Sequence, residues 1–278
     1  MIDTLVCGGK SLDLTAPQVM GILNVTPDSF SDGGLFVSVD KALQQARRML
    51  AEGASIIDVG GESTRPGASP VSVAEEIARV IPIIEAIARE LPVVISADTS
   101  KPEVMRAAVA AGAGFINDVR ALREEGAVEA ASALGVPVCL MHMHGAPRSM
   151  QENPHYHDVV SEVKSFLTQR VSRCVDAGIA REHLLIDPGF GFGKKTEHNL
   201  SLIRHLDDFL GLDIPLLVGV SRKSSIGAVL ERPVTDRLPG SLALATLASW
   251  MGAHIIRAHD VAATVDALKI CHAVKTAN

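Results

Sequence analysis

The chain has 278 residues, of which 47% are hydrophobic and 21% charged, and its formal net charge is −6 at pH 7. These proportions are near the globular average, so they exclude a disordered or low-complexity chain. The negative charge argues against a general nucleic-acid or membrane-surface binder, because such proteins need a basic face. The length allows one large domain or two small ones.

The four cysteines lie far apart, with no C-x-x-C pair and no short spacing to a histidine. This spacing argues against a disulfide framework and against a structural zinc site. The first residues, MIDTLVCGGKSLDL, lack an apolar stretch flanked by basic residues, so they do not resemble a signal peptide. The least charged internal stretch, 237–257, holds too many small and polar residues for a membrane-spanning helix. We therefore expect a cytoplasmic protein that binds neither nucleic acid nor membrane.

The chain begins with a predicted β-hairpin within residues 1–14, where TLVCGGKSLDL would turn at Gly8-Gly9. Eight short apolar runs rich in Val and Ile follow. They are VMGILNV from Val19, SIIDVG from Ser55, VVISAD from Val93, GFINDV from Gly114, PVCLMH from Pro137, LLIDPG from Leu184, PLLVGV from Pro215 and HIIRAH from His254. The segments between them have apolar residues at helical spacing and often end at a glycine. Strands and helices are therefore predicted to alternate.

Continuous apolar strands between helices indicate a parallel sheet, and eight such units in this length match a (β/α)₈ TIM barrel. A doubly wound open sheet is the alternative, but it rarely has eight strands with a polar residue at the end of every one. We expect a single barrel domain over residues 1–278, with the short N-terminal hairpin closing the bottom of the barrel.

The candidate site residues are those that follow each apolar run, because TIM barrels carry function at the C-terminal ends of their strands. They are Asn24, Asp58, Asp98, Asn117, His142, Asp187, Lys223, Arg257 and His259. Such a mixture of carboxylates, amides and cations suits a site for a polar heterocycle and an anion. An isolated Asp or Asn at a strand end is also often the N-cap of the next helix, and Asp98 before Thr-Ser-Lys-Pro could be one.

Strands seven and eight predict an anion site. Ser221, Arg222 and Lys223 directly precede a predicted helix, and barrels commonly bind phosphate at this position. Arg257 and His259 point the same way, because side chains alternate along a strand. Arg257 also follows two isoleucines, where an unpaired charge would be costly.

Two further motifs leave alternatives open. The glycine-rich run IDPGFGFGKK from Ile186 fits neither the mononucleotide loop nor the G-x-G-x-x-G fingerprint. Three phenylalanines, Phe30, Phe190 and Phe192, lie in predicted strand-end loops. A flat ligand ring that stacks on them would explain why aromatic residues are found in loops that should be polar.

His142 and His144 are spaced like the metal pair of barrel hydrolases, but no second cluster supplies further ligands. A metal-dependent hydrolase is a minor alternative.

Several strings, in order over nearly the whole chain, resemble those of bacterial dihydropteroate synthases. They are MGILNVTPDSFSDGG, IIDVGGESTRPGA, DTSKPEV, INDV, LMHMHG, LIDPGFGFGK, GVSRKS and IIRAHDV. The departures are small: members of this family often have Val at the position of Ala97 and Gln at that of His144. The first two strings are the most specific.

The resemblance implies an activity in folate synthesis. p-Aminobenzoate would displace diphosphate from 6-hydroxymethyl-7,8-dihydropterin diphosphate and give 7,8-dihydropteroate. The step would be dissociative, with diphosphate leaving first, a cation on the dihydropterin and no general base. Asp187 would stabilise that cation electrostatically.

The resemblance also implies the site residues. The pterin would be bound by Asp98, Asn117, Met141, Asp187, Phe192, Gly219 and Lys223. Three of these, Asp98, Asp187 and Lys223, would be catalytic. Asn24, Arg257 and His259 would bind the diphosphate, with Mg²⁺ shared between Asn24 and phosphate oxygens. Ser221, Phe30, Thr64 and Pro66 would bind or enclose the aminobenzoate, while Asp32 and Arg65 order the loops. A homodimer through the last helices is expected.

Two other functions use the same pterin-binding residues. A pterin-dependent methyltransferase shares the barrel but would lack the DSFSDGG and STRPG loops, and a non-catalytic pterin-binding relative would not need them. Fold analogy is a weak guide to reaction. The presence of both loops argues against these alternatives.

Overall fold

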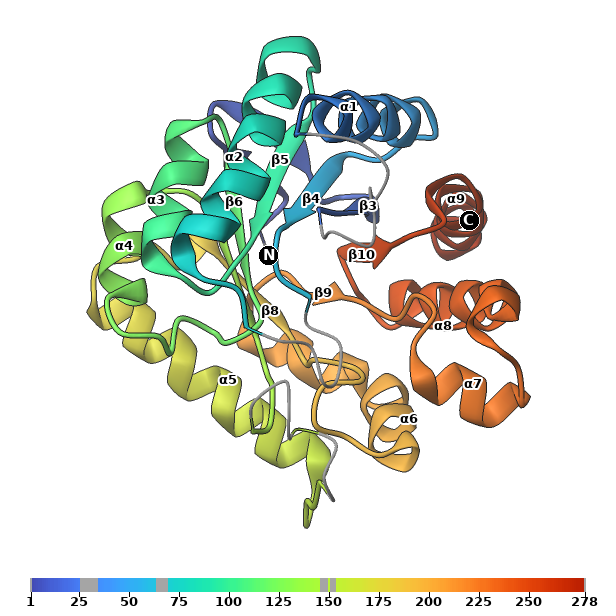
Figure 1. The fold of residues 1–278 in the computed structure, drawn as a ribbon. Helices are drawn as coiled ribbons and strands as arrows, with labels where there is room; N and C mark the ends of the chain where they lie inside the picture. The colour runs from blue at the N-terminus through green and yellow to red at the C-terminus, as the bar shows by residue number, and fades with distance from the viewer. Residues whose placement is uncertain (1, 26–34, 64–69, 146–149, 151–153, 278) are drawn as a thin grey trace.

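The computed structural model describes residues 2–25, 35–63, 70–145, 150 and 154–277. Its centre is a barrel of eight parallel strands (Figure 1). The strands are β3 (Gln18–Asn24), β4 (Ile56–Gly60), β5 (Val94–Asp98), β6 (Phe115–Asp118), β7 (Val138–Met141), β8 (Leu184–Asp187), β9 (Leu217–Val218) and β10 (Ile255–Ala258). They are ordered β8-β7-β6-β5-β4-β3-β10-β9. A parallel bridge between Ile186 and Leu216 joins β8 to β9 and closes the barrel, which confirms the predicted fold and excludes the open sheet.

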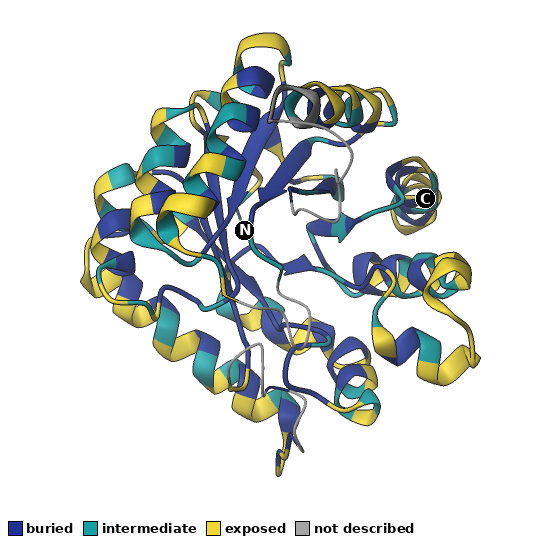
Figure 2. Cartoon of the chain, viewed as in Figure 1, coloured by how far each residue is buried: buried dark blue, intermediate teal, exposed yellow. Residues whose placement is uncertain are grey.

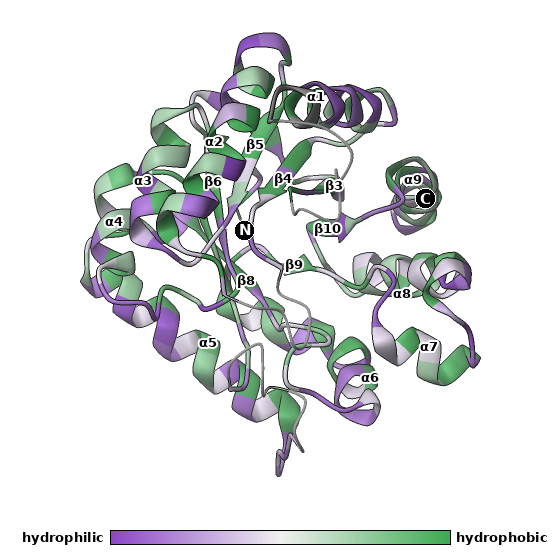
Figure 3. Ribbon diagram, viewed as in Figure 1, coloured by the Kyte–Doolittle hydropathy of each residue, from purple (hydrophilic) through white to green (hydrophobic). Residues whose placement is uncertain are grey.

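Helices surround the barrel and follow the strands in the predicted alternation (Figure 1). They are α1 (Leu35–Ala51), α2 (Val73–Glu90), α3 (Pro102–Ala110), α4 (Ala127–Leu134), α5 (Val159–Asp176), α6 (Thr196–Arg204), α7 (Ser224–Leu230), α8 (Leu238–Trp250) and α9 (Val261–Lys275). Short 3₁₀ segments cover Arg181–His183, Leu206–Leu212 and Val234–Asp236. The strands are buried almost throughout, whereas the helices are buried only on the sides that face them (Figure 2). Hydrophobic residues concentrate in the strands and on the helix faces that pack against them (Figure 3).

Successive side chains along each strand point alternately out of and into the barrel, so the buried apolar residues form two separate regions. Residues that face outward from the barrel pack against the helices in one large cluster. Inside the barrel, each of the eight strands contributes one buried apolar residue to a second cluster, which we call the apolar layer. Its members are Met20, Ile56, Val94, Phe115, Cys139, Leu185, Leu217 and Ile255. The barrel interior is therefore packed with side chains at this level.

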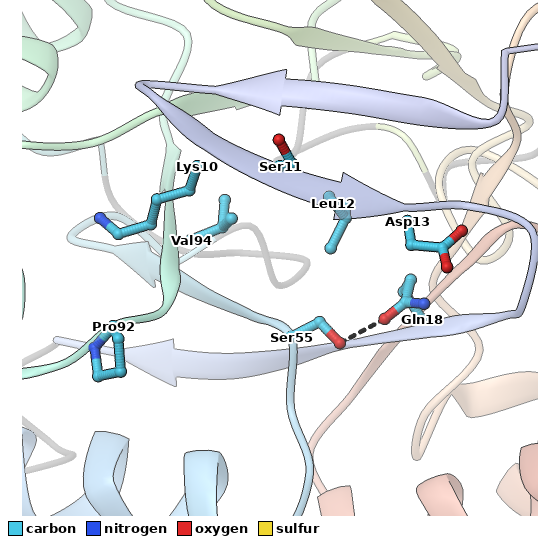
Figure 4. Close-up of a pocket in the computed structure, with 8 residues that line it drawn as sticks. All are labelled: Lys10, Ser11, Leu12, Asp13, Gln18, Ser55, Pro92 and Val94. Carbon is cyan, nitrogen blue, oxygen red and sulfur yellow. Dashed lines mark hydrogen bonds between the residues drawn. The ribbon is translucent and has the colours of Figure 1, made fainter.

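The N-terminal hairpin closes the bottom of the barrel, as the sequence predicts. Strands β1 (Thr4–Cys7) and β2 (Lys10–Asp13) pair antiparallel across Gly8-Gly9. Four hairpin side chains pack onto the apolar layer: Leu5, Cys7, Leu12 and Leu14. Figure 4 shows a cavity of about 330 Å³ between the hairpin and the beginnings of β3, β4 and β5. That cavity lies at the end of the barrel opposite to the C-terminal ends of the strands.

The described part of the chain has no helix that is both long and apolar enough to cross a membrane. This finding agrees with the small and polar residues noted in the 237–257 stretch.

Candidate active site

A second layer of side chains lies two residues further along each strand, and we call it the polar layer. Its members are Ile22, Asp58, Ser96, Asn117, Met141, Asp187, Gly219 and Arg257. The period of two keeps these positions on the inner face of the barrel, one step closer to the C-terminal ends of the strands. The interior therefore changes from apolar to mostly polar over one repeat.

Asp58 is the centre of a hydrogen-bond network in this layer. Its side chain is fully buried, and Oδ2 accepts from Arg257 Nε at 2.6 Å and from Asn117 Nδ2 at 3.1 Å. Ser96 Oγ donates to Oδ1 at 2.6 Å. A buried carboxylate is tolerated when it is paired with a cation and its oxygens are hydrogen-bonded, and both conditions hold here. The sequence marked Asp58 only as the end of a strand and gave it no role.

The network also orients Asn117. An ionised carboxylate only accepts hydrogen bonds, so the amide nitrogen of Asn117 must face Asp58. The amide oxygen then remains for a ligand. This orientation favours a ligand that presents a donor at this point.

Arg257 reaches a second carboxylate, since its Nη2 donates to Asp98 Oδ2 at 2.7 Å. The N-cap interpretation of Asp98 is therefore wrong: Lys101 occupies the N-cap position of α3, and it makes no side-chain capping bond. Burial raises the pKa of Asp98, and the charge of Arg257 opposes that rise. Arg257 thus lies across the barrel mouth between two carboxylates.

Asp187 and Lys223 form the other side of the site. Asp187 is buried, and its Oδ1 accepts from the Gly189 backbone N–H at 2.7 Å. Burial raises the pKa of Asp187 to about 6, while this hydrogen bond and the charge of Lys223 oppose the rise. Burial lowers the pKa of Lys223 to about 8. Lys223 Nζ lies 4.0 Å from the ring centre of Phe192, a cation–π distance.

Met141 and Phe192 belong to a small apolar cluster at the same end of the barrel, as expected for residues that pack near a flat ligand. Its members are Val119, Met141, Met143, Met150 and Phe192. Gly219 lies beside Arg257, and a Cβ built on it would be 3.8 Å from the Cβ of Arg257. A larger side chain at 219 would therefore project into the space next to the guanidinium.

His259 and Ser221 lie together at the ends of the last two strands. The His259 backbone N–H donates to Ser221 Oγ at 3.2 Å, and Nδ1 lies 3.0 Å from the same oxygen. Burial, together with the charge of Arg257, lowers the pKa of His259 to about 4, so the ring is neutral at pH 7. Asn24 ends β3 and is partly exposed. Phe30, Asp32, Thr64, Arg65 and Pro66 lie outside the described residues.

The two histidines spaced like a metal pair have other partners. His142 Nδ1 lies 2.9 Å from Lys194 Nζ, and the His144 ring packs on Tyr156 with 5.7 Å between ring centres. Within the described ranges, no group of three His, Cys, Asp or Glu side chains is placed to hold a metal ion. The His-x-His spacing therefore gives no support to a hydrolase.

The protein is a parallel barrel with a polar, partly charged layer at the C-terminal end of its strands, and residues 20–259 match the profile of the pterin binding enzyme family, which makes it a pterin-binding barrel enzyme. The chain is also 57% identical to the dihydropteroate synthase of Escherichia coli K12, over 98% of this chain and 97% of that one. A structure of Xanthomonas albilineans dihydropteroate synthase with 4-aminobenzoic acid superimposes with a TM-score of 0.95, at 52% identity, and covers all of both chains.

A second Xanthomonas albilineans structure, a complex with 7,8-dihydropteroate, has a TM-score of 0.90 and 49% identity over 99% of this chain and all of that one. The chain belongs to the dihydropteroate synthase family, and it is an enzyme of folate synthesis. The hydrolase, methyltransferase and non-catalytic alternatives are therefore wrong.

Proposed function

We propose that this chain joins the pterin and p-aminobenzoate by a dissociative displacement at the mouth of the barrel. The observation that carries the proposal is the convergence of two opposite sets of groups on one end of the barrel: the carboxylates Asp98 and Asp187, and the cations Lys223 and Arg257. Such an arrangement binds a polar heterocycle and stabilises charge that develops on it.

The pterin is bound through its hydrogen-bonding edge. Asp98, Asp187 and the amide oxygen of Asn117 accept from ring N–H and NH₂ groups, and the ammonium of Lys223 donates to the carbonyl. Met141 and Phe192 supply the apolar surface for the ring, and Gly219 leaves room for it.

Catalysis is mostly placement of charge. When diphosphate leaves, a cation remains on the dihydropterin, and the buried carboxylate of Asp187 stabilises it at short range in a site with little water. Asp98 and Lys223 hold the ring in place for this contact. The amine of p-aminobenzoate then attacks the cation without prior activation by a base, and the ammonium formed with the new C–N bond loses its proton to water or to the released diphosphate, so the site requires no catalytic histidine.

The diphosphate is bound by Asn24, Arg257 and His259. Arg257 has five N–H donors and uses two of them on Asp58 and Asp98, which leaves others for phosphate oxygens. Asn24 fits a Mg²⁺ ion, because its amide supplies a hard oxygen ligand and Mg²⁺ binds through few protein groups plus phosphate and water. When bound, the ion neutralises charge on the leaving diphosphate. Binding of diphosphate should therefore weaken when Arg257 becomes Ala and when EDTA is added.

The aminobenzoate is held near Ser221 and Lys223. By the resemblance, Phe30, Thr64 and Pro66 enclose its ring, and Asp32 and Arg65 order the segments that carry them. The pterin-binding groups lie at strand ends, whereas the sequence predicts loops for these five residues, so we expect the pterin to bind first and the aminobenzoate pocket to form around it.

The experiment that tests this order measures p-aminobenzoate binding to the free enzyme, with and without the pterin and Mg²⁺ diphosphate. We expect binding only in the second case, and Phe30→Leu should raise the KM for aminobenzoate while pterin affinity stays nearly unchanged. Tight binding of aminobenzoate to the empty enzyme would contradict the ordered scheme. Released diphosphate, measured with both substrates present, reports the overall reaction.

We also infer a homodimer through the last two helices. α8 and α9 pack on each other, and their outer surfaces expose large apolar side chains: Leu247, Trp250, Ile270 and Val274, each at least half exposed. Such a patch is typical of an interface between subunits. Sedimentation should show a dimer that Ile270→Glu converts to a monomer, and a monomeric parent protein would contradict the inference.

A further inference from the structure

The glycine-rich run that fits no nucleotide-binding fingerprint forms a short segment, residues 189–193, directly after Asp187 at the end of β8. Its glycines allow a close approach to the end of β7. A Cβ built on Gly189, whose φ is +70°, would lie 1.8 Å from the His142 carbonyl oxygen, and one on Gly193 would lie 2.6 Å from that of His144. No side chain fits at either position, so the segment lies directly on the backbone that follows β7.

A buried lysine side chain fastens this segment. Lys194 is only 3% exposed, and its Nζ donates to the carbonyl oxygens of Gly189 at 2.9 Å and Phe192 at 3.1 Å. A third contact is His142 Nδ1 at 2.9 Å, and the His142 carbonyl oxygen lies at 3.5 Å. Burial lowers the pKa of Lys194 to about 7; in the protonated form its three N–H donors match the three nearer acceptors. Among the described residues, none of the ion pairs includes Lys194.

His142 is suited to accept this hydrogen bond. Burial and the nearby charge of Lys194 lower the pKa of His142 to about 2, so the ring is neutral. Because an ammonium can only donate, its contact with Nδ1 requires the tautomer with the proton on Nε2 and the lone pair on Nδ1. The ring also packs edge-on against Phe166, at 4.9 Å between ring centres. The histidine that resembled half of a metal pair is therefore the acceptor that links β7 to the segment.

The segment contacts two of the groups assigned to the reaction, Asp187 and Lys223, and carries a third, Phe192. The Gly189 N–H donates to Asp187, and the Phe192 ring lies under the Lys223 ammonium. A Cβ on Gly191 would lie only 3.0 Å from Lys223 Cδ, so the segment also packs along that side chain. Any shift of residues 189–193 therefore moves the partners of both Asp187 and Lys223.

We propose that Lys194 is a positioning residue: its buried ammonium holds residues 189–193 against His142 and so sets the places of Asp187, Phe192 and Lys223 in the site. The consequence for catalysis rests on the proposed function, but the fastening of the segment does not. The amino group of Lys194 donates to the backbone carbonyls of Gly189 and Phe192.

The test compares Lys194→Met with a control that loses stability elsewhere. Met keeps the length of the side chain but donates no hydrogen bond, so the carbonyls of Gly189 and Phe192 lose their partner. Leu268→Ala removes a buried side chain in α9, which packs on β3 and α8. Hydrogen exchange of the backbone amides of residues 189–193 and calorimetric binding of 6-hydroxymethyl-7,8-dihydropterin are measured for both, below their melting temperatures.

In Lys194→Met we expect these amides to exchange at least about tenfold faster and the pterin to bind about tenfold more weakly, the loss that a hydrogen bond to a charged group represents. In Leu268→Ala neither quantity should change more than twofold. Exchange that rises equally in both variants would overturn the proposal, and so would faster exchange with unchanged pterin binding. If the parent protein itself fails to bind the pterin, the proposed function fails, while the exchange data still decide whether Lys194 fastens the segment.

His142→Phe keeps the proposal testable if Lys194→Met does not fold. It retains a ring against Phe166 and removes only the Nδ1 acceptor. The Lys194 contacts with the Gly189 and Phe192 carbonyls remain, as does the longer one with the backbone carbonyl of residue 142, so exchange in residues 189–193 should rise less than in Lys194→Met and pterin binding should weaken by a few-fold. An unchanged exchange rate in His142→Phe would contradict the role of the Lys194–His142 contact.

Discussion

The apolar and polar layers of the barrel interior lie one strand repeat apart, yet they are stabilised in different ways. In the apolar layer, Phe115 and its seven neighbours fill space, and each contributes by the area it removes from water. In the polar layer, Asp58 depends on three donors from three other strands. Loss of one member of the first layer leaves a cavity, whereas loss of Asp58 leaves the Asn117 amide and the Ser96 hydroxyl without their acceptor and leaves Arg257 with Asp98 as its remaining carboxylate. The second layer is therefore less tolerant of substitution and more closely tied to function.

Asp58→Ala should have the largest effect. It removes one of the two carboxylates of Arg257 and the acceptor of Asn117 and Ser96, and loss of these hydrogen bonds to a buried charge together with half of the ion-pair network costs about 3–5 kcal/mol. Denaturant unfolding should show a loss of this size. Pterin binding, measured by calorimetry, should also weaken at least about tenfold, because Asn117 is no longer oriented.

Phe115→Ala is the matched change in the apolar layer. A large-to-small substitution of a buried Phe also costs about 3–5 kcal/mol, but pterin affinity should stay within twofold of the parent protein. If both variants lose pterin affinity equally, the two layers are not functionally distinct.

Lys223→Met should come next. Loss of a charged hydrogen bond from a closed site costs about 1.5–3 kcal/mol, which corresponds to roughly a ten- to hundredfold lower kcat/KM. Steady-state kinetics would measure this for both substrates. Arg222→Met is the control, because Arg222 is exposed and pairs with Asp260 outside the site. A loss of less than threefold in Lys223→Met would remove Lys223 from the site.

The pH profile of kcat/KM should show two limbs. Asp187 acts as a carboxylate with a pKa of about 6, and Lys223 acts as an ammonium with a pKa of about 8. The rate should therefore rise with pH up to about 6 and fall above about 8. Lys223→Arg should remove the alkaline limb, and a profile without an acid limb would contradict the role of Asp187.

The raised pKa of Asp187 also predicts how the stability of the protein depends on pH. The pKa of Asp187 is higher in the folded state than its ordinary value of 3.8, so protonation of Asp187 favours folding. Its contribution to the free energy of unfolding is present below that ordinary value and is lost as pH rises to about 6. Unfolding of Asp187→Asn should depend less on pH over this range than unfolding of the parent protein.

Ser96→Ala should have the smallest effect. Asp58 keeps Arg257 and Asn117 as donors and loses only a hydroxyl, so the free energy of unfolding should fall by about 1.5 kcal/mol. Activity should remain within a few-fold of the parent value. A loss of pterin affinity as large as that of Asp58→Ala would show that Ser96, rather than the ion pair, orients the network.

The sequence predicted the strands because each is a short apolar run, and it predicted most members of the site because polar residues end those runs. It did not predict which polar side chains pair. Arg257 and Asp58 are 199 residues apart. β10 neighbours β3, whose residue in the polar layer is the apolar Ile22, so the long Arg257 side chain reaches past it to β4 and β5. A contact between side chains of distant strands cannot be predicted from the spacing of residues within one segment of the sequence.

For the same reason, the sequence assigned Arg257 to an anion alone. The sequence indicated that the charge of Arg257 needs a partner of opposite charge. In the structure, the carboxylates of Asp58 and Asp98 are that partner. Lys194 was missed because a lysine after a glycine-rich run looks like an exposed residue, and only the fold encloses it. Diphosphate binding by Asn24, Arg257 and His259 stays a prediction.

The hairpin at the bottom of the barrel has a consequence for the order of folding. Its side chains pack on a layer that includes Leu185, Leu217 and Ile255, which are made long after residues 1–14 leave the ribosome. The hairpin therefore completes its packing only after the later strands have been made, and its native contacts with them join residues far apart in the chain. Until β10 pairs with its neighbouring strands, part of the apolar surface on which Leu5 and Leu12 pack is missing. Burial of these two side chains should therefore be complete only when the barrel has closed.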